Sequence, residues 1–191
     1  YDFYVHTNRE LLKVKDEGQA NLLYNQLLAH GITYIIAFPF LSLLFYFDYL
    51  SQNLFVLFYL LLLIEHFGIE IFRVLIVLEK SILANVLFFL RTSFWIYIYI
   101  PYWYIQKGND IELLSILIPW VAFGLVSNVI GVLFLVKRYN KSKVALNSNW
   151  IKKGFSIGTK FLIGTIAYKV IEFSDRYIID YLLGRDVVGV Y

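Results

Sequence analysis

Long apolar runs separated by short polar segments dominate this chain. The pattern predicts five such runs, roughly at 32–47, 53–79, 82–100, 113–136 and 155–173. A helix rises about 1.5 Å per residue, so runs of this length approach or exceed the roughly 30 Å hydrocarbon core of a bilayer. Their alternation with short polar segments predicts an all-α integral membrane protein, a polytopic bundle with about five transmembrane helices here.

The composition agrees with this prediction. Hydrophobic residues make up 60% of the chain, aromatic residues 19%, and the mean hydropathy is +0.66, well above soluble domains of this size. The net charge of +3 gives no indication of nucleic-acid binding, and the absence of cysteine excludes disulfides. Because methionine is also absent, we expect the chain to be an internal piece of a longer protein.

The polar segments differ in charge, and this predicts an orientation. Residues 1–31 form an amphipathic segment with a capping box from Thr7 to Glu10, and residues 137–153 form the most basic stretch. Both segments, together with Lys80, fall on the same side of the predicted spans, where lysine and arginine therefore concentrate. The positive-inside rule places this side in the cytoplasm. The remaining parts are the four spans of 32–136 and a C-terminal region, 154–191.

The second span carries ionisable residues at membrane depth. A central Arg or Asp facing lipid costs roughly 2.5–3.5 kcal/mol, so such groups are expected to face protein or water. His66, Glu70 and Arg73 share one helical face, with Glu70 and Arg73 spaced to pair, while Glu65 lies on a neighbouring stripe. We interpret His66 as a hydrogen-bonded interior residue rather than a proton relay. The three histidines are scattered in the sequence, so no metal ligand set is expected.

Two further cations lie inside predicted spans. Arg91 has no acidic residue one helical turn away, so it either reaches Glu65 or Glu70 on the previous helix or faces a hydrated cavity; we favour the cavity. Lys169 has Glu172 at a spacing that allows a pair. These residues are the candidate site within the membrane: Arg73, Arg91, Lys169, Glu65, His66 and Glu70.

Aromatic and small residues give weaker signals. The cluster at 94–104 is typical of the aromatic belt at a membrane interface, although Trp95 and Tyr99 are also candidates for stacking on a sugar. In the fourth span, small residues four apart, Gly124/Asn128 and Ser127/Gly131, favour close helix packing. No phosphate-binding loop, zinc-protease motif or nucleophile elbow occurs, so the chain is not expected to be an enzyme.

Three groups of residues, in order along the chain, resemble the Wzx-type lipid-linked oligosaccharide flippases of the multidrug/oligosaccharidyl-lipid/polysaccharide superfamily. The first is Asp2-Phe3-Tyr4 with Arg9-Glu10. The second is Glu65-His66, Glu70 and Arg73, with Asn85, Arg91 and Trp95. The third and most specific is Asp175-Arg176 with Gly184 and Gly189.

The resemblance implies a bacterial inner-membrane transporter of 12–14 helices in two lobes. Residues 154–191 would then be the first helix of the second lobe and the start of the next. Such proteins flip undecaprenyl-pyrophosphate-linked oligosaccharide units for surface polysaccharide synthesis. No cofactor is expected, and a H⁺ or Na⁺ gradient is a candidate energy source for transport. Expected partners are the lipid-linked glycan, membrane lipids, a polysaccharide polymerase and a chain-length regulator. Alternatives are a drug or cation exporter of a sister family, a membrane glycan enzyme such as a repeat-unit polymerase, and a non-transporting assembly subunit.

Overall fold

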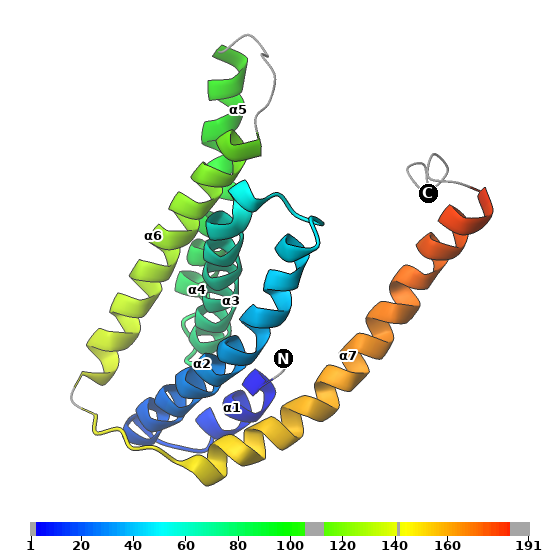
Figure 1. Cartoon of the computed structure of the whole chain (residues 1–191). Coiled ribbons are helices and arrows are strands. Elements are labelled where there is room, and N and C mark those ends of the chain that lie inside the picture. The colour runs from blue at the N-terminus through cyan, green and yellow to red at the C-terminus, as the bar shows by residue number, and fades with distance from the viewer. Residues whose placement is uncertain (1–2, 106–112, 141, 184–191) are drawn as a thin grey trace.

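A computed structural model describes residues 3–105, 113–140 and 142–183, and this described part is helical and contains no β-strand (Figure 1). The fold class predicted from the sequence, an all-α polytopic bundle, is therefore confirmed. In order, the elements are α1 (Phe3–Leu11), α2 (Asp16–Tyr46), η1 (Gln52–Leu54), α3 (Phe55–Val77), α4 (Ser81–Phe89), η2 (Leu90–Phe94), α5 (Trp95–Ile105), α6 (Leu113–Tyr139) and α7 (Ser148–Leu183).

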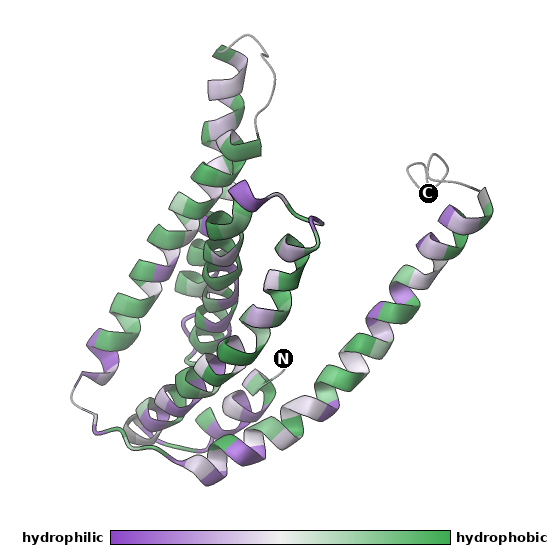
Figure 2. Cartoon of the chain, in the orientation of Figure 1, coloured by the Kyte–Doolittle hydropathy of each residue, from purple (hydrophilic) through white to green (hydrophobic). Residues whose placement is uncertain are grey.

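Within the described residues, four helical segments are long and apolar enough to cross a membrane. They are Gly18–Tyr46, Gln52–Val77, Ser81–Ile105 and Leu113–Tyr139. The third consists of α4 and α5 joined by η2, a single turn of π-helix that contains Arg91. The expected fifth span, 155–173, lies inside α7 but does not belong to this set, since it carries Lys160, Lys169 and Glu172. Figure 2 shows the contrast between the mainly hydrophobic residues of the four spans and the mixed hydropathy along α7.

The first span begins earlier than its apolar pattern indicates. The sequence separates residues 1–31 from a span at 32–47, whereas α2 runs without a break from Asp16 to Tyr46 and includes Pro39. The polar residues of its first half therefore belong to the bundle. This change of boundary brings Gln26 and His30 next to α3.

The break between α3 and α4 is where the sequence places it, at residues 79–81. A glycine often takes the left-handed position that ends a helix. Here Glu79 takes it, with a φ of 60°. The backbone N–H of Lys80 donates to the carbonyl of Leu75 at 2.8 Å, and that of Glu79 donates to Ile76 at 3.0 Å. These two bonds form the Schellman motif that ends many helices.

Small residues on α6 allow it to pack closely on α3. A Cβ added to Gly124 would lie 2.4 Å from Cγ2 of Ile64, and one added to Gly131 would lie 2.5 Å from Cγ2 of Ile71. Between them, the Ser127 hydroxyl donates to the carbonyl of Leu87 on α4 at 2.9 Å. The small-residue spacing seen in the sequence thus marks the face of α6 that contacts α3 and α4.

The segments predicted to share one side of the membrane do lie at one end of the bundle. Figure 1 shows α1 beside the start of α7, at the same end of the bundle as the end of α6. Phe3, Ala29 and Ile151 form a small core that joins α1, α2 and α7. The connecting segment 142–147 is fixed to α2, since Asn25 donates to the carbonyl of Ala145 at 2.9 Å and accepts from the backbone N–H of Asn147 at 2.7 Å.

Beyond its first turns, α7 leaves the bundle (Figure 1). Ile151, Gly154 and Gly158 are buried, but the described side chains from 159 onward are almost all exposed, on every side of the helix. Contacts with the bundle are therefore concentrated in the first turns of α7.

Candidate functional site

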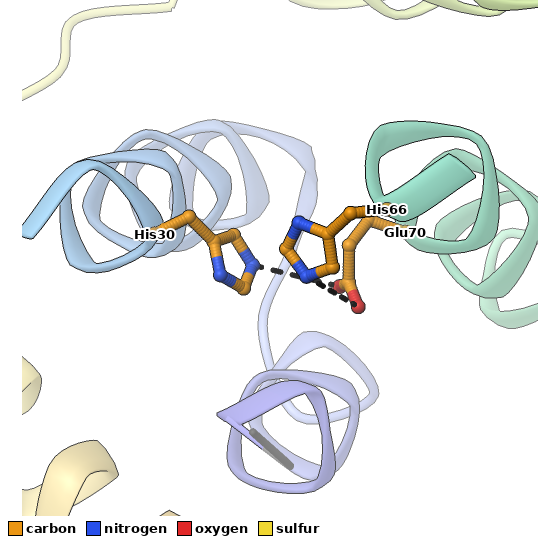
Figure 3. Close-up of side chains that lie close together, drawn as sticks. All are labelled: His30, His66 and Glu70. Carbon is orange, nitrogen blue, oxygen red and sulfur yellow. Dashed lines mark ion pairs between the residues drawn. The ribbon is translucent and has the colours of Figure 1, made fainter. Parts of the chain in front are cut away.

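Facing positions of α2 and α3 form a buried polar cluster. Gln26, His30 and Tyr34 are four residues apart on α2, so they share one face of the helix. This face meets the His66 and Glu70 face of α3, as Figure 3 shows for His30, His66 and Glu70. Glu70 is 7% exposed, and Gln26 and His30 are 4% exposed each. The cluster is therefore a polar site inside an apolar bundle.

Glu70 is at the centre of this cluster. Its Oε1 accepts a hydrogen bond from Nη1 of Arg73 at 2.7 Å, as the helical spacing predicted, and its Oε2 accepts one from Nε2 of Gln26 at 2.5 Å. Nε2 of His30 lies 3.7 Å from Oε2, and Nε2 of His66 lies 3.9 Å from Oε1. The arginine balances the buried carboxylate, while both histidines point at it from beyond hydrogen-bond distance.

The histidines are scattered in the sequence, but the structure brings two of them together with Glu70, so the expectation that no metal ligand set exists is wrong. The rings of His30 and His66 are 4.6 Å apart, and one ligand atom from each, with a carboxylate oxygen of Glu70, lies within 4.8 Å of the others. They are far apart in sequence, and the antiparallel packing of α2 on α3 brings them together. His6 lies elsewhere, against Trp150 at the contact of α1 with α7.

His66 is hydrogen-bonded, as expected, and its partner is the hydroxyl of Tyr34 at Nδ1. This bond orients the ring, so that Nε2 points toward Glu70. Tyr34, His30 and His66 also line a cavity of about 260 Å³ between α2 and α3. A larger cavity of about 400 Å³, mainly apolar, lies between α2, α3 and α6 and contacts Gln26, His30 and Glu70. His30 therefore lines both cavities.

Arg91 occupies a separate, second polar site on the other side of α3. Its Nη1 lies 2.7 Å from the carbonyl oxygen of Glu65 and 3.1 Å from the Oε2 of the same residue, and only 2% of the Arg91 surface is exposed. Nε1 of Trp120 on α6 donates to Oε1 of Glu65 at 2.9 Å. The hydrated cavity that we favoured for Arg91 is thus wrong, because the neighbouring helix supplies the partner that its own helix lacks.

The structure does not gather the predicted cations in one cavity. Each has its own carboxylate: Arg73 with Glu70, Arg91 with Glu65, and Lys169 with Glu172 at 2.5 Å. Their exposure differs, since 31% of the Arg73 side chain and 51% of the Lys169 side chain are exposed, against 2% for Arg91. Arg73 also lies over the ring of Tyr4, 3.5 Å from its centroid.

The two sugar-stacking candidates have protein partners. The Trp95 ring stacks on Trp120, with centroids 5.9 Å apart and planes 10° apart. The Tyr99 hydroxyl lies 3.1 Å from the hydroxyl of Ser115. The exposed rings of Tyr97, Tyr102 and Tyr104 fit the expected interfacial belt.

The third group of residues in the resemblance, Asp175-Arg176 with Gly184 and Gly189, lies at or beyond the C-terminal end of the described chain. Arg176 lies in α7. Gly184, Gly189 and the side chain of Asp175 lie outside the described part of the chain.

Sequence reasoning missed Gln26, His30, Tyr34 and Trp120. The first three repeat every fourth residue, which is a helical signal, but they fall around the assumed boundary at residue 31. Nothing in the sequence around Trp120 indicates its role, because its partner Glu65 lies on another helix. Gln26, His30 and Tyr34 belong to the cluster around Glu70 and His66, which offers nitrogen and oxygen atoms to a cation.

No protein-family model, no curated protein and no solved structure matches the chain.

Proposed function

We propose that this chain is part of a membrane transporter that flips undecaprenyl-pyrophosphate-linked oligosaccharide units from the cytoplasmic to the periplasmic leaflet. The observation that carries the proposal is the set of ionisable side chains buried between helices of membrane length, above all Glu70 with Arg73 and the histidines. Such groups at membrane depth are costly, and they are characteristic of substrate and ion pathways. The glycan cargo comes from the sequence resemblance.

We infer from the exposure of the three cations which of them would contact the cargo. A pyrophosphate can replace a carboxylate as the partner of a cation that it can reach. Arg73 and Lys169 are partly exposed, whereas Arg91 is enclosed by Glu65 and the surrounding helices. We therefore assign the cargo contacts to Arg73 and Lys169 and a structural role to Arg91.

A second lobe would explain the exposed length of α7. Lys169 and Glu172 lie in the expected fifth span, and an exposed ion pair at this depth is unfavourable against lipid. Further helices packed on α7 would cover it and complete the cavity between two lobes, as alternating access requires. On this proposal, residues 1–191 alone do not flip glycan, and flipping by the monomeric chain would contradict the two-lobe arrangement.

The proposal also fixes an orientation in the bacterial inner membrane. We expect α1 and the 142–147 segment to face the cytoplasm and the α2–η1 connection to face the periplasm. Because the chain has no cysteine, single cysteines at Ser142 and Ser51 can be labelled with an impermeant thiol reagent in intact cells. Labelling at Ser51 with protection at Ser142 is expected, and the reverse result would invert the topology.

Transport itself can be tested in proteoliposomes that contain the complete protein and a lipid-pyrophosphate-linked oligosaccharide. An impermeant glycosidase reports the fraction of glycan on the outer leaflet. Arg73→Gln and Lys169→Gln should each slow flipping per folded protein, and the rates are normalised to folded yield because Arg73→Gln leaves the buried Glu70 carboxylate without its cation. The matched control is Lys152→Gln, which removes an exposed lysine at the start of α7. Unchanged flipping in both variants, or no flipping by the unmodified protein, would overturn the proposal.

One observation favours a second candidate, a drug or cation exporter. The 400 Å³ cavity is lined mainly by apolar side chains and has the carboxylate of Glu70 at its wall, an arrangement suited to a lipophilic cation. In this case, Glu70→Gln should abolish efflux of a fluorescent cation from loaded vesicles. Efflux that depends on Glu70, together with no glycan flipping, would select the exporter.

A further inference from the structure

We propose that His30, His66 and Glu70 form a binding site for a divalent transition-metal ion, and that Zn²⁺ fits it best. The site goes beyond the transport function proposed above, and metal binding can be measured without any transport assay. The site was not expected from the sequence, in which the histidines are far apart. The three residues come from two helices, α2 and α3, and their side chains point toward one another (Figure 3).

The positions of the ligand atoms support a shared centre. Nε2 of His30 and Nε2 of His66 lie 3.7 and 3.9 Å from the Glu70 carboxylate oxygens, and the three ligand atoms lie within 4.8 Å of one another. Zinc bonds of about 2.0–2.1 Å at tetrahedral angles place ligand atoms about 3.3 Å apart. Tetrahedral geometry would then require the distances from His30 and His66 to the Glu70 carboxylate to shorten by about half an ångström. The distance between the two histidine nitrogens would have to shorten by more.

His66 has the second interaction that metal-binding histidines normally show. When one ring nitrogen binds a metal, the other usually donates its proton to an oxygen, which fixes the ring and its tautomer. The Tyr34 hydroxyl is in place at Nδ1 of His66 and can accept that proton. Nε2 then presents its lone pair toward the centre, beside Glu70.

Gln26 provides an independent observation. Its side-chain nitrogen lies 3.3 Å from Nε2 of His30 and 2.5 Å from Oε2 of Glu70, so its N–H groups occupy the space between two of the ligands. Its Oε1 is buried and has no hydrogen-bond partner among the described residues. Rotating the amide by half a turn would direct this oxygen into the site. That orientation is unfavourable beside a carboxylate alone but favourable beside a cation.

The chemistry of the donors selects the metal. Two imidazoles and a carboxylate are ligands that zinc commonly uses, and a set of three leaves a fourth position for Gln26 or water. The chain contains neither cysteine nor methionine, so it offers no sulfur to a softer ion such as Cu⁺. Nη1 of Arg73 donates to Oε1 of Glu70 at 2.7 Å and so orients the carboxylate beside the two imidazoles.

An entry route is present. The 400 Å³ cavity contacts Gln26, His30 and Glu70 at its inner wall and reaches Tyr139 and Asn140, at the end of α6. An ion can therefore approach from the end of the bundle where α1 and the 142–147 segment lie.

Binding can be measured on the whole chain purified in detergent and stripped with a chelator. A chromophoric chelator should report one Zn²⁺ taken up per chain, and Co²⁺ should give the intense visible absorption of a four-coordinate site. X-ray absorption of the zinc-loaded protein should show imidazole scattering together with oxygen ligands. This measurement needs no variant, so a poorly folding mutant cannot obscure it. An oxygen-only shell would overturn the proposal.

Variants then assign the ligands. His30→Ala, His66→Ala and Glu70→Gln should each weaken zinc binding by more than the 10- to 100-fold typical of losing a second-layer partner, and Tyr34→Phe by about that amount. His6→Ala is the matched control, because His6 is the remaining histidine and lies at the contact of α1 with α7. No zinc uptake by the unmodified chain would overturn the site. An affinity in His30→Ala and His66→Ala that is unchanged from the unmodified chain, or a loss in His6→Ala alone, would also overturn it.

Discussion

Arg91 is joined to Glu65 at two points. One nitrogen, Nη1, lies 2.7 Å from the backbone carbonyl of Glu65 and 3.1 Å from its carboxylate. The contact ties η2 to the middle of α3. Gly68, one turn further along α3, makes room for it, because a Cβ there would lie 2.5 Å from the same nitrogen.

This contact predicts that Arg91→Ala lowers the yield of folded protein. Removing one partner of a fully buried ion pair costs about 3–5 kcal/mol, and we expect less here because 30% of the Glu65 side chain is exposed. Glu65→Ala in the same chain should restore part of the loss, since no unpaired carboxylate then remains. Fluorescence-detected gel filtration after heating measures both effects. A stable Arg91→Ala protein would contradict the structural role.

The close approach of α6 to α3 predicts that Gly124→Ala destabilises the bundle by about 1–3 kcal/mol, the usual cost of overpacking. The added methyl would lie 2.4 Å from Cγ2 of Ile64. Gly164→Ala on α7 is the control, because a Cβ there has nothing within 4 Å and helix propensity favours alanine. The melting temperature in detergent should fall for the first variant only. Equal effects at both glycines would contradict this packing.

The attachment of the 142–147 segment to α2 predicts a specific protease sensitivity. Asn25→Ala removes the bonds to Ala145 and Asn147, each worth about 1 kcal/mol, and the segment should open more often. Trypsin cleavage at Lys143 should then be faster than in the unmodified chain. Asn149→Ala, an exposed change close by, should leave the cleavage rate unaltered. No acceleration in the Asn25 variant would mean that the segment is held by other contacts.

The burial of His6 at the contact of α1 with α7 predicts that the stability of the fold depends on pH. Burial lowers the pKa of His6 below its ordinary value of about 6.5; the Glu10 carboxylate opposes this shift, and Lys153 and Lys13 add to it. The unfolded chain therefore binds a proton at a pH where the folded chain does not. The free energy of unfolding should fall as the pH drops below about 6.5 and should be unaffected by His6 above it.

The measurement is the melting temperature at about pH 7.5 and about pH 5.5, for the unmodified chain and for His6→Leu. Leucine keeps an apolar contact with Trp150 but does not titrate. The decrease on acidification should be smaller in the variant. The same decrease in both proteins would assign the pH dependence to other groups.

The sequence by itself determined the features that depend on residues close together in the chain. Apolar runs predicted the membrane-length helices, the i, i+3 spacing predicted the pairing of Glu70 with Arg73, and small residues four apart predicted the close-packed face of α6. These succeed because the period of a helix fixes which neighbours along it share a face. The break at 79–81 was predicted from its polar residues without a glycine or proline signal, and its left-handed residue is Glu79.

Only the tertiary structure decided which faces meet. The partner of Arg91 is Glu65 on another helix, and His30 joins His66 and Glu70 across 36 or more positions of sequence. Such contacts depend on the rotation and relative shift of two helices, which the pattern along either helix does not specify. A rotation of α2 by one residue, about 100°, would turn His30 away from Glu70 and leave the hydropathy pattern unchanged. The physical reason is that insertion into a membrane requires only that a helix be apolar overall. A buried polar cluster requires that one particular face of a helix lie against one particular face of its neighbour.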